Sequence, residues 1–193
     1  MDIDYLIDEI FKKQDILDIE KIKSSKIKFF ISATNIESGN LEYFGNQNNV
    51  DIFEALRASN AAPIAYNRSV KINGEKYIDG AIGAPLSVNI EKAKQEGAEI
   101  IIAVDNSNHS IISDIILKFY SLFTSKLFRQ KLKLYYKELK FKNNDGQVLI
   151  IKPSIKLPVN TLDNNRDHII KTIQIGYNDV INQSTVIKGL LFQ

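Results

Sequence analysis

The sequence predicts an α/β fold, with one layered domain, a mostly parallel central sheet and helices on both sides. Apolar residues recur with helical and with strand periodicity in alternation along the chain. The run 99–105 has a continuous apolar centre, a pattern typical of a parallel strand buried on both faces. The 193 residues, of which 44% are hydrophobic, suffice for a single domain over 1–193 with a real core.

The first third of the chain predicts a helix, a hairpin and a second helix. Residues 26–34 have the composition of a strand, and 41–44 return antiparallel to it after a turn. Asp51 is placed to cap a short helix over 51–57. The first helix spans 3–12, and its apolar side chains recur at helical spacing: Ile3, Leu6, Ile7, Ile10 and Phe11.

Residues 69–78 give the clearest local signal. Two alternating runs, 69–72 and 75–78, flank the dipeptide Asn73-Gly74. Asn-Gly is the preferred two-residue hairpin turn because both positions need a positive φ. The hairpin places Asp79 at the end of its second strand.

The second half continues the alternation of helices and strands. A helix over 90–96, stopped by Gly97, leads into the apolar strand 99–105. A strand follows at 147–151, and a last helix spans about 165–182. We expect that helix to bury the residues spaced by three and four: Ile170, Ile173, Tyr177 and Val180.

Composition excludes several kinds of site. Twenty-five basic residues against 23 acidic ones give a net charge of +2, which does not indicate nucleic-acid binding. There is no cysteine, and His109 and His168 are the two histidines, so we expect no metal or other cofactor. A nucleotide-binding domain is disfavoured because no Gly-x-Gly-x-x-Gly loop or P-loop is present. Without a signal peptide or a membrane-spanning run in the given sequence, we expect a cytoplasmic location.

The motif at 77–81, Tyr-Ile-Asp-Gly-Ala, ends the predicted hairpin and follows the run Ala-Ser-Asn-Ala-Ala-Pro at 58–63. An Asp-Gly pair alone marks a turn. Here small residues follow the acid, which suits an orienting carboxylate at the mouth of a sheet. This order resembles the patatin-like phospholipases, which are acyl hydrolases with a Ser-Asp dyad. Further segments resemble that family in the same order: 31–36, 38–39, 86–104, 150–153 and 176–177.

The resemblance implies a three-layer patatin-like domain that hydrolyses lipid or other acyl esters. Asp79 would be the catalytic base, and Gly80 and Ala81 would line the pocket and leave room for an acyl chain. The sequence has no Gly-x-Ser-x-Gly nucleophile turn, and the family's Gly-rich oxyanion loop is also absent. We therefore expect the C-terminal portion of the domain, with its N-terminal strands missing. Such a chain would be inactive alone, and would need the missing half or self-associate.

A second reading remains open, in which the chain is a catalytically dead binding or scaffold protein. The candidate residues also have structural readings. Asp79 alone would be a turn acid, Ser59 a structural residue at a helix end, and Asp105 a cap after a buried strand. His109 and His168 are expected at the surface.

The segment 111–142 predicts a long basic helix, with eight Lys or Arg against two acids. It could contact anionic lipid head groups at a membrane surface. The default reading is a packed helix with a solvated basic rim, because its apolar residues are needed for burial.

Overall fold

The computed structural model shows two compact units. Unit 1 comprises residues 1–85 and 111–140, and unit 2 comprises 86–110 and 141–193. That the chain forms one domain stays a prediction. The structure describes the following residues: 2–63, 65–66, 68–82, 86–106, 120–122, 124–131, 147–159 and 163–192.

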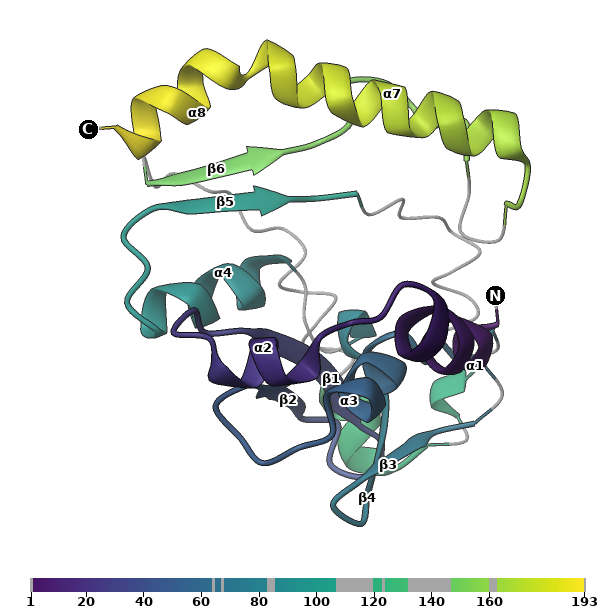
Figure 1. Cartoon of the computed structure of the whole chain (residues 1–193). Helices are drawn as coiled ribbons and strands as arrows, with labels where there is room; N and C mark the ends of the chain where they lie inside the picture. Colours follow the sequence, from purple (N-terminus) through teal and green to yellow (C-terminus); the bar gives the residue numbers. More distant parts are fainter. Residues whose placement is uncertain are drawn as a thin grey trace. The chain divides into compact units, whose positions relative to one another are not determined.

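Unit 1 contains a four-stranded sheet in which every strand pair is antiparallel. The strand order is β2-β1-β4-β3 (Figure 1). The α/β class is confirmed, but the mostly parallel central sheet is not, because two hairpins supply this sheet and a hairpin joins antiparallel strands. The four strands are β1 (Phe30–Asn35), β2 (Leu41–Gly45), β3 (Val70–Ile72) and β4 (Glu75–Asp79).

The β3–β4 hairpin has the predicted turn. Asn73 has a φ of 51° and Gly74 a φ of 88°, both in the left-handed region that such a turn requires. Val70 lies opposite Tyr77 in the resulting register. The hairpin therefore sets the position of Asp79, which is the last residue of β4 and lies opposite Ala33 of β1.

The first strand begins later than predicted, at Phe30 rather than at Lys26. The preceding residues bind the side chain of Asn46 instead of a neighbouring strand. The Asn46 amide nitrogen donates to the Ile27 carbonyl oxygen at 2.8 Å, and its oxygen accepts from the Phe29 N–H at 2.9 Å. The Asn46 side-chain amide thus provides the hydrogen bonds that a neighbouring strand would otherwise make with this segment.

The predicted N-terminal helix is present, but it changes hydrogen-bond pattern along its length. The α-helix α1 (Ile3–Tyr5) continues into η1 (Leu6–Gln14), which has the wider π-helical pattern. Ile3 and Ile7 are buried on its inner face. The remaining helices named in this unit are α2 (Ile19–Ser24), α3 (Ile52–Ser59) and the 3₁₀-helix η2 (Gly80–Ile82).

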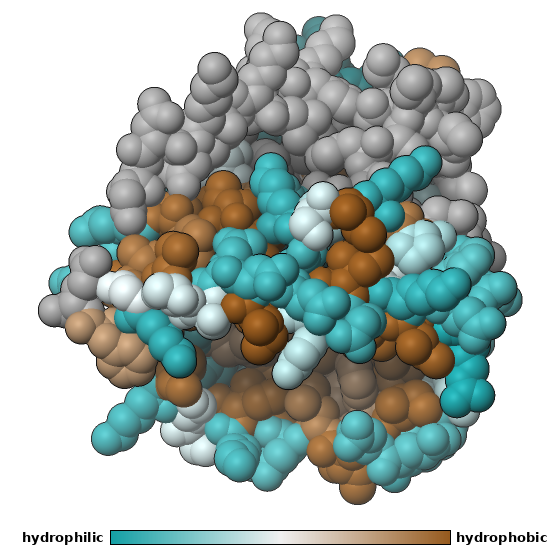
Figure 2. Space-filling model, turned by 90° about the horizontal axis from the view of Figure 1, so that it is seen from above, coloured by the Kyte–Doolittle hydropathy of each residue, from teal (hydrophilic) through white to brown (hydrophobic). Residues whose placement is uncertain are grey.

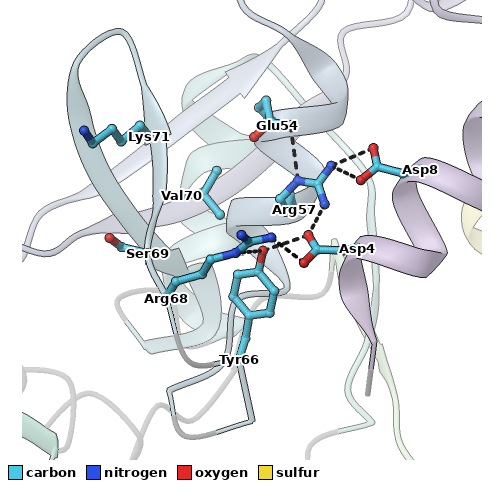
Figure 3. Close-up of a pocket in the computed structure, with 9 residues that line it drawn as sticks. All are labelled: Asp4, Asp8, Glu54, Arg57, Tyr66, Arg68, Ser69, Val70 and Lys71. Atoms are coloured by element: carbon cyan, nitrogen blue, oxygen red, sulfur yellow. Dashed lines mark hydrogen bonds and ion pairs between the residues drawn. The ribbon is translucent and has the colours of Figure 1, made fainter.

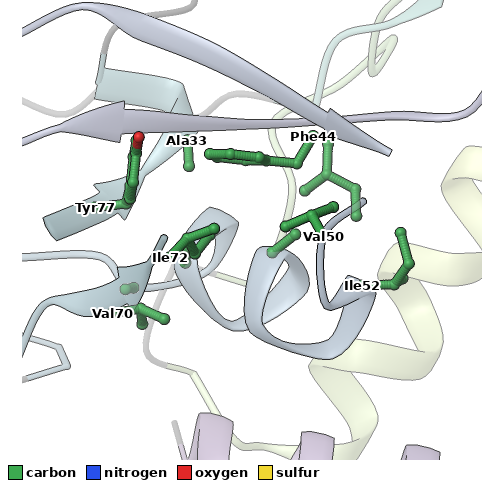
Figure 4. Close-up of a cluster of buried hydrophobic side chains, with 11 residues drawn as sticks. Ala33, Phe44, Val50, Ile52, Val70, Ile72 and Tyr77 are labelled. Carbon is green, nitrogen blue, oxygen red and sulfur yellow. The ribbon is translucent and has the colours of Figure 1, made fainter. Parts of the chain in front are cut away.

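Helix α3 covers one face of the sheet and forms the main core with it (Figure 4). The predicted cap is confirmed, since the Asp51 carboxylate accepts from the Phe53 N–H at 2.8 Å. Phe44 and Tyr77 meet edge to face, with ring centroids 5.1 Å apart. The cluster comprises Ile31, Ala33, Phe44, Val50, Ile52, Ala55, Ala58, Ala61, Val70, Ile72 and Tyr77.

Unit 2 is built on two parallel strands, with Ile101 opposite Val148. One face of the pair packs on α4 through Ile90, Ile101 and Ala103. Gly97, at a φ of 91°, follows that helix as predicted. The elements are α4 (Leu86–Gln95), β5 (Ile101–Val104), β6 (Val148–Ile151), α7 (Arg166–Asn182) and α8 (Ser184–Leu191).

Two burial predictions in unit 2 are wrong. Strand β5 is buried on one face only, because Ile102 is 39% and Val104 67% exposed. On α7, the expected buried stripe is exposed, with Ile173 at 66%. The helix turns its opposite face inward, where buried Asp179 accepts from the Ser154 N–H at 3.1 Å. The exposed members of the predicted stripe are Ile170, Ile173, Tyr177 and Val180.

The surface view in Figure 2 shows apolar side chains mixed among hydrophilic ones. Among the described residues, no helix combines the length and apolar character needed to cross a bilayer. Much of the predicted basic helix, namely 111–119 and 132–142, lies outside the described residues. Residues 126–131 within it are helical.

Candidate active site

Asp79 is held by its main chain on both sides. Its N–H donates to the Ala61 carbonyl oxygen at 3.1 Å. Its own carbonyl oxygen accepts from the hydroxyl of Thr34 at 2.9 Å, and Thr34 is buried. The half-buried carboxylate therefore projects from a strand end fixed by β1 and by the chain that follows α3.

The carboxylate of Asp79 accepts the main-chain N–H of Ala81 at 2.8 Å. Burial raises the pKa of Asp79, and the Ala81 hydrogen bond opposes that shift in part. The raised pKa makes this carboxylate a better proton acceptor than an ordinary surface aspartate.

Gly80 fits where a larger residue would not. A Cβ at this position would lie 2.2 Å from the carbonyl oxygen of Ser32 and 2.5 Å from its hydroxyl oxygen. Gly80 is buried and Ala81 is exposed. That both residues line a substrate pocket stays a prediction.

Ser59 is the last residue of α3. A nucleophilic serine of an elbow sits on a tight turn between a strand and the helix that follows it. Ser59 lies instead at a helix C-terminus, as the structural reading of this residue predicted.

A polar pocket of about 360 Å³ lies elsewhere in unit 1, where η1 meets α3 and β3 (Figure 3). Its centre is Arg57, whose side chain is only 9% exposed. Arg57 donates two hydrogen bonds to Asp8, at 2.9 and 3.0 Å, and a further one to Asp4. The pocket is lined by Asp4, Asp8, Glu54, Arg57, Tyr66, Arg68, Ser69, Val70 and Lys71.

Asp4 joins Arg57 to the chain before β3. It accepts the hydroxyl of Tyr66 at 2.9 Å and also binds Arg68, while Arg68 Nε donates to the Tyr66 oxygen at 2.8 Å. Burial alone would raise the pKa of Asp4, but the Tyr66 hydrogen bond and the charges of Arg68 and Arg57 lower it. The hydrogen bonds from Lys12 and Arg57 lower the pKa of Asp8.

Sequence reasoning missed this charged network. Its partners lie far apart along the chain, as Asp4 and Arg57 do, so periodicity cannot pair them. One local sign was available. Asp4 and Asp8 are four residues apart on one helix, which places two carboxylates on the same face.

The region that carries Asp79 and this network can be compared with known families. Residues 3–90 match the family model of the patatin-like phospholipases. These residues, called the patatin-like region below, are similar to that family. No curated protein matches the chain. The predicted family is thus confirmed by the region that contains all four strands of the main sheet.

The similarity of residues 3–90 is therefore to a family of phospholipases. The other residues considered from the sequence fall outside this region. His168 Nδ1 lies 2.7 Å from Asp163, and Asp105 pairs with Lys152 at 3.2 Å. That Asp105 acts as a cap stays a prediction. His109 lies outside the described residues. Within the part of the chain that the structure describes, no cluster of three or more His, Cys, Asp or Glu residues suits a metal ion.

Proposed function

We propose that Asp79 is the base of a Ser-Asp dyad in a lipid acyl hydrolase of the phospholipase A type. The observation that carries this proposal is the geometry of Asp79 at the end of β4, within the patatin-like region. Its main chain is held from two sides, and burial raises the pKa of its carboxyl group. These features suit a group that accepts a proton in a fixed place.

The reaction begins with a serine hydroxyl that is a weak nucleophile until a base takes its proton. The Asp79 carboxylate accepts this proton as the serine oxygen attacks the ester carbonyl carbon. The tetrahedral intermediate collapses, and Asp79 returns the proton to the leaving alcohol. Water then attacks the carbonyl carbon of the acyl-serine while Asp79 accepts a proton from it. The bond between the serine oxygen and the acyl group breaks, Asp79 returns the proton to the serine oxygen, and the fatty acid leaves.

The proposal requires a serine from outside these 193 residues, since the sequence has no Gly-x-Ser-x-Gly. The chain alone should not hydrolyse short-chain para-nitrophenyl esters. A longer polypeptide that adds an in-frame Gly-x-Ser-x-Gly should do so, and Asp79→Asn in it should abolish turnover. Asp163→Asn, an acid outside the patatin-like region, serves as the matched control and should keep turnover.

The second candidate is a catalytically dead binding or scaffold protein, which the missing nucleophile motif favours. The two candidates differ in one result. If the coding sequence upstream holds no such motif and the chain is a stable, inactive monomer, the binding-protein reading replaces the hydrolase. Turnover by the Asp79→Asn variant of a longer polypeptide would instead remove Asp79 from the mechanism.

A further inference from the structure

We propose that the hydrogen-bonded network of Asp4, Arg57 and Tyr66 positions Asp79, by fixing the chain segment whose Ala61 carbonyl oxygen accepts the Asp79 N–H. This inference rests on the proposed function only for its catalytic meaning. The contacts that carry it are structural, and they can be tested without turnover.

The first step leads from the N-terminal helix to Tyr66. Asp4 lies on α1. Ile3 on α1 and Ile7 on the continuing η1 are fully buried, so this N-terminal helix is anchored in the core. The Tyr66 hydroxyl donates to Asp4 at 2.9 Å. The guanidinium carbon of Arg68 lies 5.3 Å from the centre of the Tyr66 ring, which adds a cation–π contact.

The second step leads from Tyr66 to Asp79. The Tyr66 N–H donates to the Ala62 carbonyl oxygen at 2.9 Å, and Tyr66 also forms an isolated bridge with Pro63. Ala61, directly before Ala62, is fully buried and accepts the Asp79 N–H at 3.1 Å. The side chain of Tyr66 thus holds one end of a short turn, and Asp79 binds the other end.

Arg57 reaches the same turn from its own side. It lies in the last turn of α3, next to Ala58, whose carbonyl oxygen accepts the Ala61 N–H at 3.1 Å. Charged partners from two elements hold its guanidinium: Asp4 and Asp8 from the N-terminal helix, and Glu54 from α3 at 3.2 Å. A buried guanidinium with several carboxylate partners has little freedom to move. The end of α3, and hence Ala61, is therefore fixed.

Figure 3 shows that this arrangement converges from three places. Asp4 and Asp8 come from the N-terminal helix, Arg57 and Glu54 from α3, and Arg68 from the chain before β3. The acids and bases of the network bind one another. The cluster therefore holds these elements together, and Asp79 remains the proposed catalytic residue.

The test is amide hydrogen exchange, followed by NMR, on the 193-residue chain. Tyr66→Phe removes the hydroxyl that binds Asp4 and keeps the ring. Tyr5→Phe is the matched control, since it removes a hydroxyl from the residue next to Asp4 and Tyr5 is 51% exposed. We expect the Asp79 amide to exchange about tenfold faster in Tyr66→Phe. The amides of β2 should keep their rates, and Tyr5→Phe should change neither.

A second measurement follows the carboxyl carbon of Asp79 through a pH titration. Because burial raises the pKa of this group, a loosened segment admits water and lowers that pKa. The Ala81 hydrogen bond is local and remains. We expect a lower Asp79 pKa in Tyr66→Phe and an unchanged one in Tyr5→Phe. Arg57→Lys should act in the same direction as Tyr66→Phe and more strongly.

Two results would overturn the inference. In one, folded Tyr66→Phe leaves both the exchange rate and the titration of Asp79 as in the parent chain. In the other, β2 amides accelerate as much as Asp79, which indicates general destabilisation only. Failure of the proposed function is a separate result. Asp79→Asn could keep turnover in a longer polypeptide while Tyr66→Phe still accelerates exchange of the Asp79 amide. That result would reject the Ser-Asp dyad and support the positioning role of the network.

Discussion

Gly80 lies against Ser32 so closely that a Cβ on Gly80 would be 2.2 Å from the Ser32 carbonyl oxygen. Ser32 belongs to β1, and Gly80 directly follows the last residue of β4. The contact is between main chains, so a side-chain rotation cannot relieve it. The small residue after Asp79 is therefore required for the two central strands of the sheet to meet.

Gly80→Ala should destabilise the chain by about 1–3 kcal/mol, the usual cost of forcing an extra methyl group into a packed site. Urea denaturation measures the loss. Gly176→Ala is the matched control, because a Cβ there meets nothing within 4 Å and Gly176 lies inside α7. Alanine in a helix interior should stabilise by about 0.5–1 kcal/mol. Equal effects of the two substitutions would contradict the close contact at Ser32.

Asp79→Asn should stabilise the chain near neutral pH. The pKa of Asp79 is raised in the folded state, so folding favours its protonated form. Its contribution is favourable below the unfolded-state pKa and is lost as the pH rises through the folded pKa. Asparagine keeps the oxygen that accepts the Ala81 N–H and has no charge to bury.

The measurement is the melting temperature of parent and variant at several pH values. We expect the Asp79→Asn variant to melt higher at pH 7 and the difference to shrink in acid. Asp51→Asn, at the N-cap of α3, is the control. This variant should not melt at a higher temperature than the parent chain at pH 7. A destabilised Asp79→Asn variant at neutral pH would contradict the burial of the carboxylate.

The Asp4 and Asp8 pair should produce the opposite pH dependence. Their pKa values are lowered in the folded state by Tyr66, Lys12 and the two arginines. Their stabilisation is present above the unfolded-state pKa and is lost as the pH falls through the folded pKa. The unfolding free energy should therefore drop between about pH 5 and pH 2. The double variant Asp4→Asn, Asp8→Asn should be less stable at neutral pH and show a smaller acid-dependent loss, as followed by urea titrations at each pH.

The exposed stripe of α7 should promote self-association of the isolated chain. Ile173 and Tyr177 are 66% and 63% exposed, and apolar side chains gathered on one helix face favour contact with another surface. Ile173→Lys should shift the chain toward the monomer in size-exclusion chromatography across a concentration series. Lys171→Gln, on the same helix, is the control and should not. An unchanged elution profile for Ile173→Lys would show that this face does not mediate assembly.

Local signals in the sequence predicted local structure well. The Asn73-Gly74 turn, the Asp51 cap and the Gly97 stop each depend on a few neighbouring residues, and all three are confirmed. The start of β1 could not be predicted in this way. It depends on the Asn46 side chain, which is distant along the sequence and binds Phe29 and Ile27.

The candidate site was accessible from the sequence only in part. The position of Asp79 at a strand end followed from the hairpin, because a two-residue turn fixes the register of both strands. The contacts that hold it did not follow, since Ala61 and Thr34 belong to other segments. The burial of α7 was predicted for the wrong face, because periodicity identifies an apolar stripe but not the surface that covers it.

The parallel pairing of β5 with β6 has a consequence for the order of folding. The β3–β4 hairpin closes over two residues and can form within microseconds. Strands β5 and β6 pair only when the loop 105–147 closes. Closing so long a loop costs conformational entropy, and the hydrogen bonds of the ladder offset this cost only after the strands have met. During synthesis the antiparallel sheet of unit 1 can form on the ribosome while β6 is still untranslated. We therefore expect the β5–β6 ladder to form later than the antiparallel sheet.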